Sequence, residues 1–335
     1  MRRRLTIVLS LMAIALLAVA PGVQAQATTG RISGIVKDTS SAVLPGVSVT
    51  VTETRTGFTR TEATDAQGAY IFVSLPLGDY TVGAELQGFK KASKSGFVLG
   101  SDGRLTADFS LEVGQFSETI QVTIASETVN TVSGEVARIV DRAQVQDLAL
   151  NGRNYLQLAN LIPGAPIMNY NALDIMTGLG ISTSINGSRQ NANSLTVDGG
   201  FNMDSGSNNS QISNVGVDFI EEVNIKTANF SAEYGRNSGA SINVVTRSGS
   251  NTFKGSAFEY LRRDKFDAND WFANLKGVKK APLNYDNYGF SIGGPALKDK
   301  LFFFGGVEWK TIRRYTAPTF RTLPNSAMRG GDFSS

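Results

Sequence analysis

The side chains that most often carry chemistry are scarce in this chain. Its 335 residues include no cysteine and no histidine. Cys–His and Ser–His catalytic pairs, thiolate metal sites and disulfide bonds are therefore excluded. Paired carboxylates remain possible, and Asp198 with Asp204 is one such pair. Both lie on a polar loop, so we interpret them as solvated side chains. We predict no catalytic residue, no metal site, no cofactor and no enzyme.

The charge of the chain gives no sign of a nucleic-acid partner. The formal net charge is +3, from 32 basic and 29 acidic residues. Residues 1–25 hold three arginines and no acid, so removing them leaves 29 basic residues against 29 acidic ones. A neutral chain has no overall attraction for phosphate.

Residues 1–25 have the pattern of a secretory signal peptide. Arg2–Arg4 precede an apolar core, Leu5–Ala20, and small residues follow at the cleavage positions. The alternative is a single membrane anchor. The core is short for an anchor and is followed directly by Pro21-Gly22. No other segment is long enough for a membrane helix, so we expect any membrane crossing to use strands.

Short alternating segments between turn residues predict a small β-sandwich over residues 30–114. Val47, Val49 and Val51 share one face of a strand, and hydroxyl residues share the other. The segments GIVKD, LPGVSVTV, TDAQGAYIF and LPLGDYTV, in this order, resemble the carboxypeptidase regulatory-like domain. This resemblance implies a transthyretin-like sandwich of about seven strands, classed with carbohydrate-binding-like folds. Tyr70 and Phe72 share a face, and we interpret them as core residues rather than a sugar-stacking platform.

The middle of the chain predicts a second β-rich domain over residues 131–249. Phe219–Thr227 places Phe219, Val223 and Ile225 on one parity, as expected for a strand packed on one side. A β-branched run follows at Ala240–Arg247. Together with the phrase LNGRNYLQLANLIPG, this order resembles the plug of TonB-dependent outer-membrane receptors of the Oar-like group. The resemblance implies an α+β plug domain within a mainly β protein.

The same resemblance implies a TonB box in the linker at residues 115–130. TonB captures such a box by strand addition, which uses the backbone and demands little of the side chains. The alternative is an ordinary plug strand. The candidate TonB-box residues are Glu118, Thr119, Ile120, Gln121, Val122 and Thr123.

A polar stretch at Phe201–Ser213 has two interpretations. It is either a plug loop that contacts ligand or a flexible surface loop, and we favour the surface loop because polar loops are common and binding sites are few.

Residues 250–335 predict the first strands of an outer-membrane β-barrel. Thr252–Tyr260 alternates, with Phe258 and Tyr260 on one face. A long polar connection then leads to a strand with Tyr288, Phe290 and Ile292 on one face. A short turn leads to a further strand with Leu301, Phe303, Val307 and Trp309 on one face. Alternating long loops and short turns are typical of such barrels. About three strands cannot close a barrel, so we expect a longer receptor.

The function implied by the resemblance is energy-coupled uptake of an unidentified ligand across the outer membrane. The expected partners are TonB, outer-membrane lipid and that ligand. Two alternatives are a structural or adhesion-related outer-membrane protein and a soluble periplasmic carbohydrate-binding protein.

Overall fold

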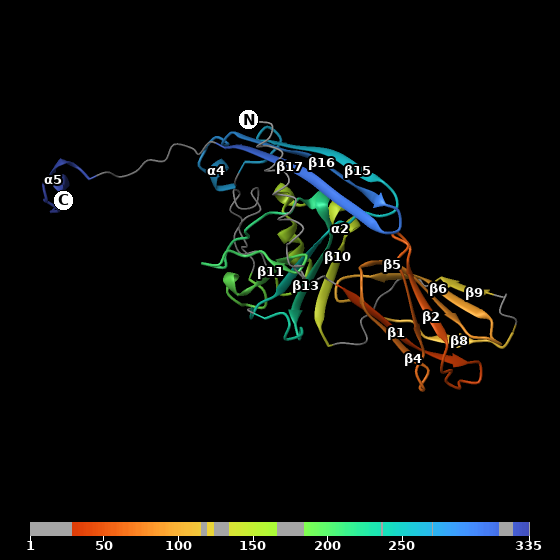
Figure 1. The fold of residues 1–335 in the computed structure, drawn as a ribbon. Coiled ribbons are helices and arrows are strands. Elements are labelled where there is room, and N and C mark those ends of the chain that lie inside the picture. The colour runs from red at the N-terminus through yellow and green to blue at the C-terminus, as the bar shows by residue number, and fades with distance from the viewer. Residues whose placement is uncertain are drawn as a thin grey trace, which may run out of the picture. The chain divides into compact units, whose positions relative to one another are not determined.

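The computed structural model describes residues 29–114, 119–123, 134–165, 184–235, 237–269, 271–314 and 324–334. The fold is mainly β, as the sequence predicts, and its strands form four sheets (Figure 1). Two compact units result. One holds the residues up to 255 with 292–305, and the other holds 256–291 with 306–335. The predicted signal peptide lies outside the described residues. In the part of the chain that is described, no helix is long and apolar enough to cross a membrane.

Two sheets enclose one hydrophobic core in the amino-terminal module, which confirms the predicted sandwich. One sheet has the order β4-β1-β7, with β8 also paired to β1, and the other has the order β3-β2-β5-β6-β9. The strands are β1 (Gly30–Asp38), β2 (Ser48–Glu53), β3 (Thr59–Ala63), β4 (Ala69–Leu75), β5 (Gly78–Glu85), β6 (Lys91–Leu99), β7 (Arg104–Thr106), β8 (Phe109–Leu111) and β9 (Thr119–Thr123).

Side chains of alternate residues fill the core of the sandwich. Val49 and Val51 are fully buried on β2, while the hydroxyl residues that alternate with them are more exposed. Tyr70 and Phe72 are buried on β4, with ring centroids 5.8 Å apart in an edge-to-face arrangement. The Tyr70 hydroxyl donates a hydrogen bond to the carbonyl of Ala107. Both aromatic rings therefore belong to the core, as predicted.

A five-stranded mixed sheet with the order β10-β13-β14-β11-β12 forms the centre of residues 134–249, here called the central domain. Only the β11–β14 pair is parallel within this sheet. The strands are β10 (Val136–Asp141), β11 (Ser194–Val197), β12 (Gly200–Phe201), β13 (Ile220–Ala228) and β14 (Ser241–Thr246).

Short helical segments pack their apolar residues against this sheet. Helix α2 (Arg142–Asp147) begins at Asp141, whose side chain accepts a hydrogen bond from the Gln144 amide at 2.9 Å. The 3₁₀ segment η2 (Tyr155–Leu161) adds buried Tyr155 and Leu158 to a core that includes Val223 and Ile242. The central domain is therefore α+β. The boundaries predicted between the parts of the chain stay predictions.

The prediction for the strand around Val223 was wrong in two respects. Phe219 belongs to a short 3₁₀ turn, η4 (Val217–Phe219), and not to the strand. Strand β13 is also buried on both faces rather than one. Val223 and Ile225 enter the hydrophobic core, while the opposite face carries polar residues that are also buried.

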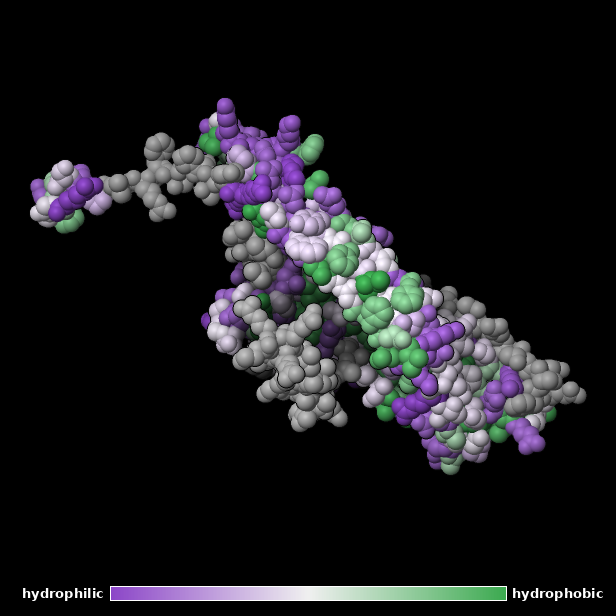
Figure 2. Space-filling model, turned by 45° about the horizontal axis from the view of Figure 1, so that its top comes forward, coloured by the Kyte–Doolittle hydropathy of each residue, from purple (hydrophilic) through white to green (hydrophobic). Residues whose placement is uncertain are grey.

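A three-stranded sheet with the order β15-β16-β17 follows, with strands β15 (Lys254–Arg263), β16 (Leu283–Leu297) and β17 (Leu301–Arg314). As predicted, Tyr288, Phe290 and Ile292 share an exposed face of β16, while Asn287 and Ser291 on the other face are buried. The long connection between β15 and β16 contains a short helix, α4 (Trp271–Leu275). Hydrophobic side chains gather along the visible face of the three-stranded sheet, and hydrophilic ones surround the end of the sheet near α4 (Figure 2).

The aromatic face of β15 differs from the exposed aromatic face of β16. The hydroxyls of Ser256 and Ser291 lie 2.9 Å apart, so Ser256 shares the face of Ser291. Phe258 lies on that same face, because a Cβ built on Gly289 would meet the Phe258 ring at 2.7 Å. The apolar side chains of β15 and β16 therefore cannot be assigned to one face from their alternation alone.

Candidate functional site

The predicted TonB-box segment forms an edge strand of the sandwich. Residues Thr119–Thr123 make up β9, which pairs in parallel with β6. The pairing runs from Lys91 opposite Thr119 to Ser95 opposite Thr123. Glu118 lies outside the described residues. Strand β9 is the last in its sheet, so among the described residues its outer edge has no neighbouring strand.

The loop at Asn202–Ser213 is organised around one carboxylate. The side chain of Asp204 accepts hydrogen bonds from the backbone amides of Gly206, Ser207, Asn209 and Ser210, at 2.7 to 3.2 Å. These backbone bonds, with those of the serine hydroxyls, hold the pKa of Asp204 well below its usual value. The loop thus has a defined internal geometry, and whether it contacts a ligand stays an open prediction.

The other member of the carboxylate pair, Asp198, also has a local structural role. Its side chain accepts from the Thr246 amide at 2.8 Å and from the Thr246 hydroxyl at 2.7 Å. These bonds tie the turn after β11 to the end of β14. No group of three or more Asp, Glu, His or Cys residues within the described ranges is arranged to hold a metal ion.

The polar face of β13 lies beneath a loop of the sandwich, residues Gly100–Gly103, which joins β6 to β7. The Ser101 amide donates to the Glu222 carboxylate at 2.7 Å. The Asn224 side-chain amide donates to the Ser101 carbonyl at 3.0 Å and to its hydroxyl at 2.9 Å. We call the contact formed by Ser101, Asp102, Glu222, Asn224 and Lys226 the β13 interface.

Lys226 makes the charged contacts of the β13 interface. Its ammonium lies 3.1 Å from the Asp102 carboxylate and 2.8 Å from that of Glu135. It also lies 4.0 Å from the centre of the Tyr234 ring, a cation–π distance. Only 3% of the Lys226 side chain is exposed, so its charge depends on these partners rather than on water. An open cavity of about 320 Å³ borders Lys226 and Asp102 at this end of the interface.

The loop approaches β13 closely at Gly100. A Cβ on Gly100 would lie 2.9 Å from the end of the Ile139 side chain and 3.0 Å from the Glu222 carboxylate, so a larger residue requires these two side chains to shift. Burial raises the pKa of Glu222 above its usual value, although the hydrogen bonds from Ser101 oppose this rise. The β13 interface therefore combines tight packing with a carboxylate that is costly to bury.

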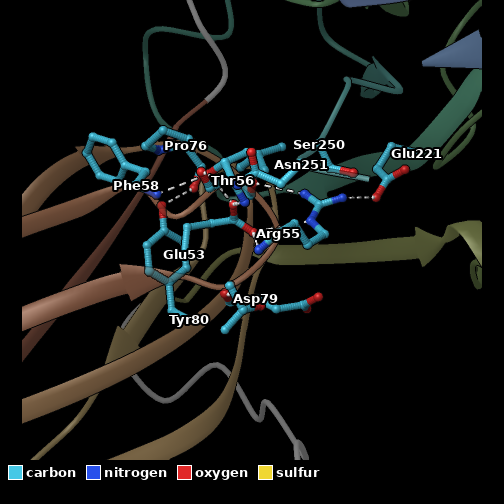
Figure 3. Close-up of polar contacts among 12 residues, drawn as sticks. Glu53, Arg55, Thr56, Phe58, Pro76, Asp79, Tyr80, Glu221, Ser250 and Asn251 are labelled. Carbon is cyan, nitrogen blue, oxygen red and sulfur yellow. Dashed lines mark hydrogen bonds and ion pairs between the residues drawn. The ribbon is translucent and has the colours of Figure 1, made fainter. Parts of the chain in front are cut away.

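A second polar contact joins the sandwich to the start of β13 (Figure 3). Glu53, which is only 1% exposed, accepts from the Arg55 guanidinium at 3.2 Å and from the Thr56 amide at 2.8 Å. Arg55 reaches from this network to Glu221 at 3.1 Å. Asn251 closes the same turn, because its backbone amide donates to the Arg55 carbonyl at 3.0 Å and its side chain donates to the Thr56 carbonyl at 2.8 Å. The turn between β2 and β3 is thereby bound both to β13 and to the segment that follows β14.

Sequence reasoning missed these interface residues. The alternation in FIEEVNIKT shows Glu222, Asn224 and Lys226 on one parity, but that pattern is normally a water-facing side. The only signal in the sequence was the side-chain amide of Asn224 between the charged residues Glu222 and Lys226. Their partners in the sandwich loop lie more than a hundred residues earlier in the chain.

Two family models match the chain, and both agree with the architecture. The carboxypeptidase regulatory-like domain matches residues 31–112, and an outer membrane beta barrel domain matches residues 245–335. A relative with a known role matches nearly the whole chain. The TonB-dependent transporter Oar of Myxococcus xanthus is 33% identical over 327 residues, which covers 90% of this chain. Over most of its own length, the chain is therefore a homologue of this TonB-dependent transporter. It spans 29% of the length of Oar.

Solved structures with some similarity include an outer-membrane transporter and a siderophore receptor. The outer membrane transporter YddB of Escherichia coli is 16% identical with a TM-score of 0.42, and the match covers 52% of this chain and 26% of YddB. The siderophore receptor PirA of Acinetobacter baumannii is 16% identical with a TM-score of 0.39, covering 52% of this chain and 24% of PirA. The family models and the relationship to TonB-dependent transporters together indicate the cell outer membrane as the location of the protein.

Proposed function

We propose that the protein is a TonB-dependent outer-membrane transporter, which takes up an unidentified ligand with energy delivered by TonB. The observation that carries this proposal is the 33% identity with Oar over 90% of the chain. The order of the domains supports it, because a sandwich, a mixed central sheet and long strands with an exposed apolar face follow one another. The proposed activity makes and breaks no bond of the ligand, so the protein is not an enzyme.

We further propose that the central domain is the plug and that Glu118–Thr123 is the TonB box. The place of β9 supports the second assignment. It is a five-residue strand at the edge of a sandwich sheet, it is the last strand in the chain before the central domain, and it is held by backbone pairing on one side. Strand addition needs a free backbone edge, and β9 has one among the described residues.

Binding to TonB tests both assignments. The natural protein, extracted from outer membranes, is passed over an immobilised periplasmic domain of TonB. Because strand addition uses backbone amides, Val122→Pro removes a donor and is expected to weaken binding at least tenfold. The matched control, Val122→Ala, keeps the amide and is expected to bind like the parent.

Each other outcome has a distinct meaning. Binding that is unaffected by Val122→Pro places the box outside residues 118–123. An outer-membrane protein that never binds TonB is a structural or adhesion-related protein. Recovery of the protein in a detergent-free periplasmic extract supports a soluble carbohydrate-binding protein instead.

A further inference from the structure

The sandwich covers the polar face of β13. Glu222, Asn224 and Lys226 are each at most 8% exposed, and each bonds to Ser101 or Asp102 of the β6–β7 loop. We propose that this face is a docking surface for the β6–β7 loop, and that pulling by TonB separates the loop from β13 as the plug opens. This inference rests on the proposed function and assigns the sandwich a role in it.

A continuous backbone route connects the TonB-box candidate to the interface. Strand β9 pairs with β6 along five residue pairs. Strand β6 ends at Leu99, and the next four residues are the loop that lies on β13. Since the outer edge of β9 has no neighbouring strand in the part of the chain that the structure describes, TonB adds to the sheet there without displacing β6. A force on β9 therefore acts on β6 and then on the loop.

The β13 interface is the weakest of the contacts along this route. The sandwich has its own hydrophobic core, with Ile32, Val49 and Phe72 fully buried. Strand β13 is paired with β10 on one side and with β14 on the other. The interface between the sandwich loop and β13 consists mainly of hydrogen bonds and an ion pair, and water replaces these at small net cost when the two separate. Unfolding of either domain would instead expose its buried apolar side chains to water, which costs more free energy. Separation also breaks the Arg55–Glu221 ion pair, but its side chains are 30% and 29% exposed, so water already screens it. The sandwich therefore separates from β13 before either domain unfolds.

Separation leaves a surface that is already suited to water. The uncovered face of β13 presents a carboxylate, an amide and an ammonium in a row, while the apolar face stays in the core of the central domain. Charged and amide groups regain hydration when they are exposed, so the uncovered strand stays folded. The sandwich thus acts as a releasable cover of the plug.

Cysteine labelling in living cells tests the proposal, because the parent chain has no cysteine in these 335 residues. Single reporters are placed on each side of the interface, as Asn224→Cys and Ser101→Cys in the full natural protein. A small maleimide is added to cells with TonB and to cells without it. Both reporters are expected to react at least ten times faster in the cells with TonB.

A control inside the central domain distinguishes separation from unfolding. Val244 lies on β14 and is fully buried in the hydrophobic core of the central domain, so Val244→Cys serves as this control. It is expected to react slowly in both kinds of cell. Two reporters are used because one of the substitutions could itself loosen the contact. Each variant must also be present in the outer membrane at the level of the parent protein.

The outcomes separate this inference from the proposed function. A protein that binds TonB but whose two reporters react equally in both kinds of cell retains the proposed function and overturns the inference. Faster reaction of Val244→Cys as well also overturns it, because the whole central domain then opens. A protein that does not bind TonB overturns the proposed function itself.

Discussion

At the scale of single residues, Lys226 is buried among groups that the sequence does not place together. Its ammonium contacts Asp102 of the sandwich and Glu135 of the central domain. Lys226→Met removes the cation and leaves two facing carboxylates. Breaking a buried ion pair costs about 3–5 kcal/mol, and because the Asp102 side chain is 31% exposed to screening water we expect about 2 kcal/mol here.

Amide hydrogen exchange of β13 measures this loss. A change of about 2 kcal/mol corresponds to roughly 30-fold faster exchange if the amides open with the interface. The control is Lys37→Met on β1, because Lys37 is an exposed residue. Exchange that changes less than about threefold would show that Lys226 does not hold β13 to the sandwich.

Glu222 gives the β13 interface a dependence on pH. Burial raises the pKa of Glu222 above its usual value of 4.5, with Glu221 and Asp102 adding to the rise. The folded state therefore binds a proton more tightly than the unfolded state. The contribution of Glu222 to stability is fully present below pH 4.5 and is lost as the pH rises through the folded pKa.

The corresponding variant is Glu222→Gln, which keeps an acceptor for the Ser101 amide and cannot ionise. We expect the protection of β13 amides, corrected for intrinsic exchange, to fall from pH 4 to pH 8 more steeply in the parent than in the variant. Glu112→Gln, an exposed change on the sandwich, serves as the control. Equal slopes for Glu222→Gln and the parent refute the assignment.

At the scale of elements, the orientation of each strand in the β15–β17 sheet can be tested by one kind of substitution. Phe290 lies on the exposed face of β16, whereas Phe258 lies on the opposite face of the sheet. An arginine on a lipid face costs about 2–4 kcal/mol at the centre of a bilayer, but much less on a lumen face. We therefore expect Phe290→Arg to lower the amount of folded protein in the outer membrane strongly and Phe258→Arg to lower it little.

Folded protein is measured by the shift in gel mobility between unheated and heated outer-membrane samples. The two variants are matched, because each changes a phenylalanine to an arginine on neighbouring strands. If Phe258→Arg is the more damaging of the two, the faces are assigned the wrong way round.

The sequence predicted the strands in which one face is apolar and the other is polar and exposed or facing a polar interior. The valines of β2 and the exposed aromatic residues of β16 have a two-residue period, because one side of each strand is apolar and the other is not. The resemblance to known families predicted the order of the domains. Strand β13 could not be predicted in full, because its polar face is buried by residues of another domain. Periodicity does not distinguish a face covered by a polar loop from a face covered by water.

The pairing of β9 with β6 was also beyond sequence reasoning. The alternation at Ile120 and Val122 predicts a strand but not its partner. Parallel pairing depends on where the sandwich presents a free edge, and strand β6 itself, KASKSGFVL, has little apolar alternation to mark it. The candidate TonB box was found from resemblance, and its place on the sandwich came only from the fold.

At the scale of the whole molecule, we expect the central domain to fold without the sandwich but to need it as a cover for the polar face of β13. Each has its own hydrophobic core, so deletion of residues 30–112 is expected to leave the central domain folded. The deletion retains residues 118–123, so we expect TonB binding to persist. The polar face of β13 loses its cover, and Asn224→Cys in this background is expected to react with maleimide at the fast rate even in cells without TonB.

The comparison that decides the matter is between two reporters in the deleted protein. Val244→Cys is expected to stay slow, because the core beneath β14 does not depend on the sandwich. Fast reaction at both positions means that the sandwich supports the fold of the central domain and is not merely its cover. Slow reaction of Asn224→Cys means that another part of the protein covers β13. Fast reaction of Asn224→Cys alone agrees with a central domain that folds without the sandwich and whose polar β13 face the sandwich covers in the parent protein.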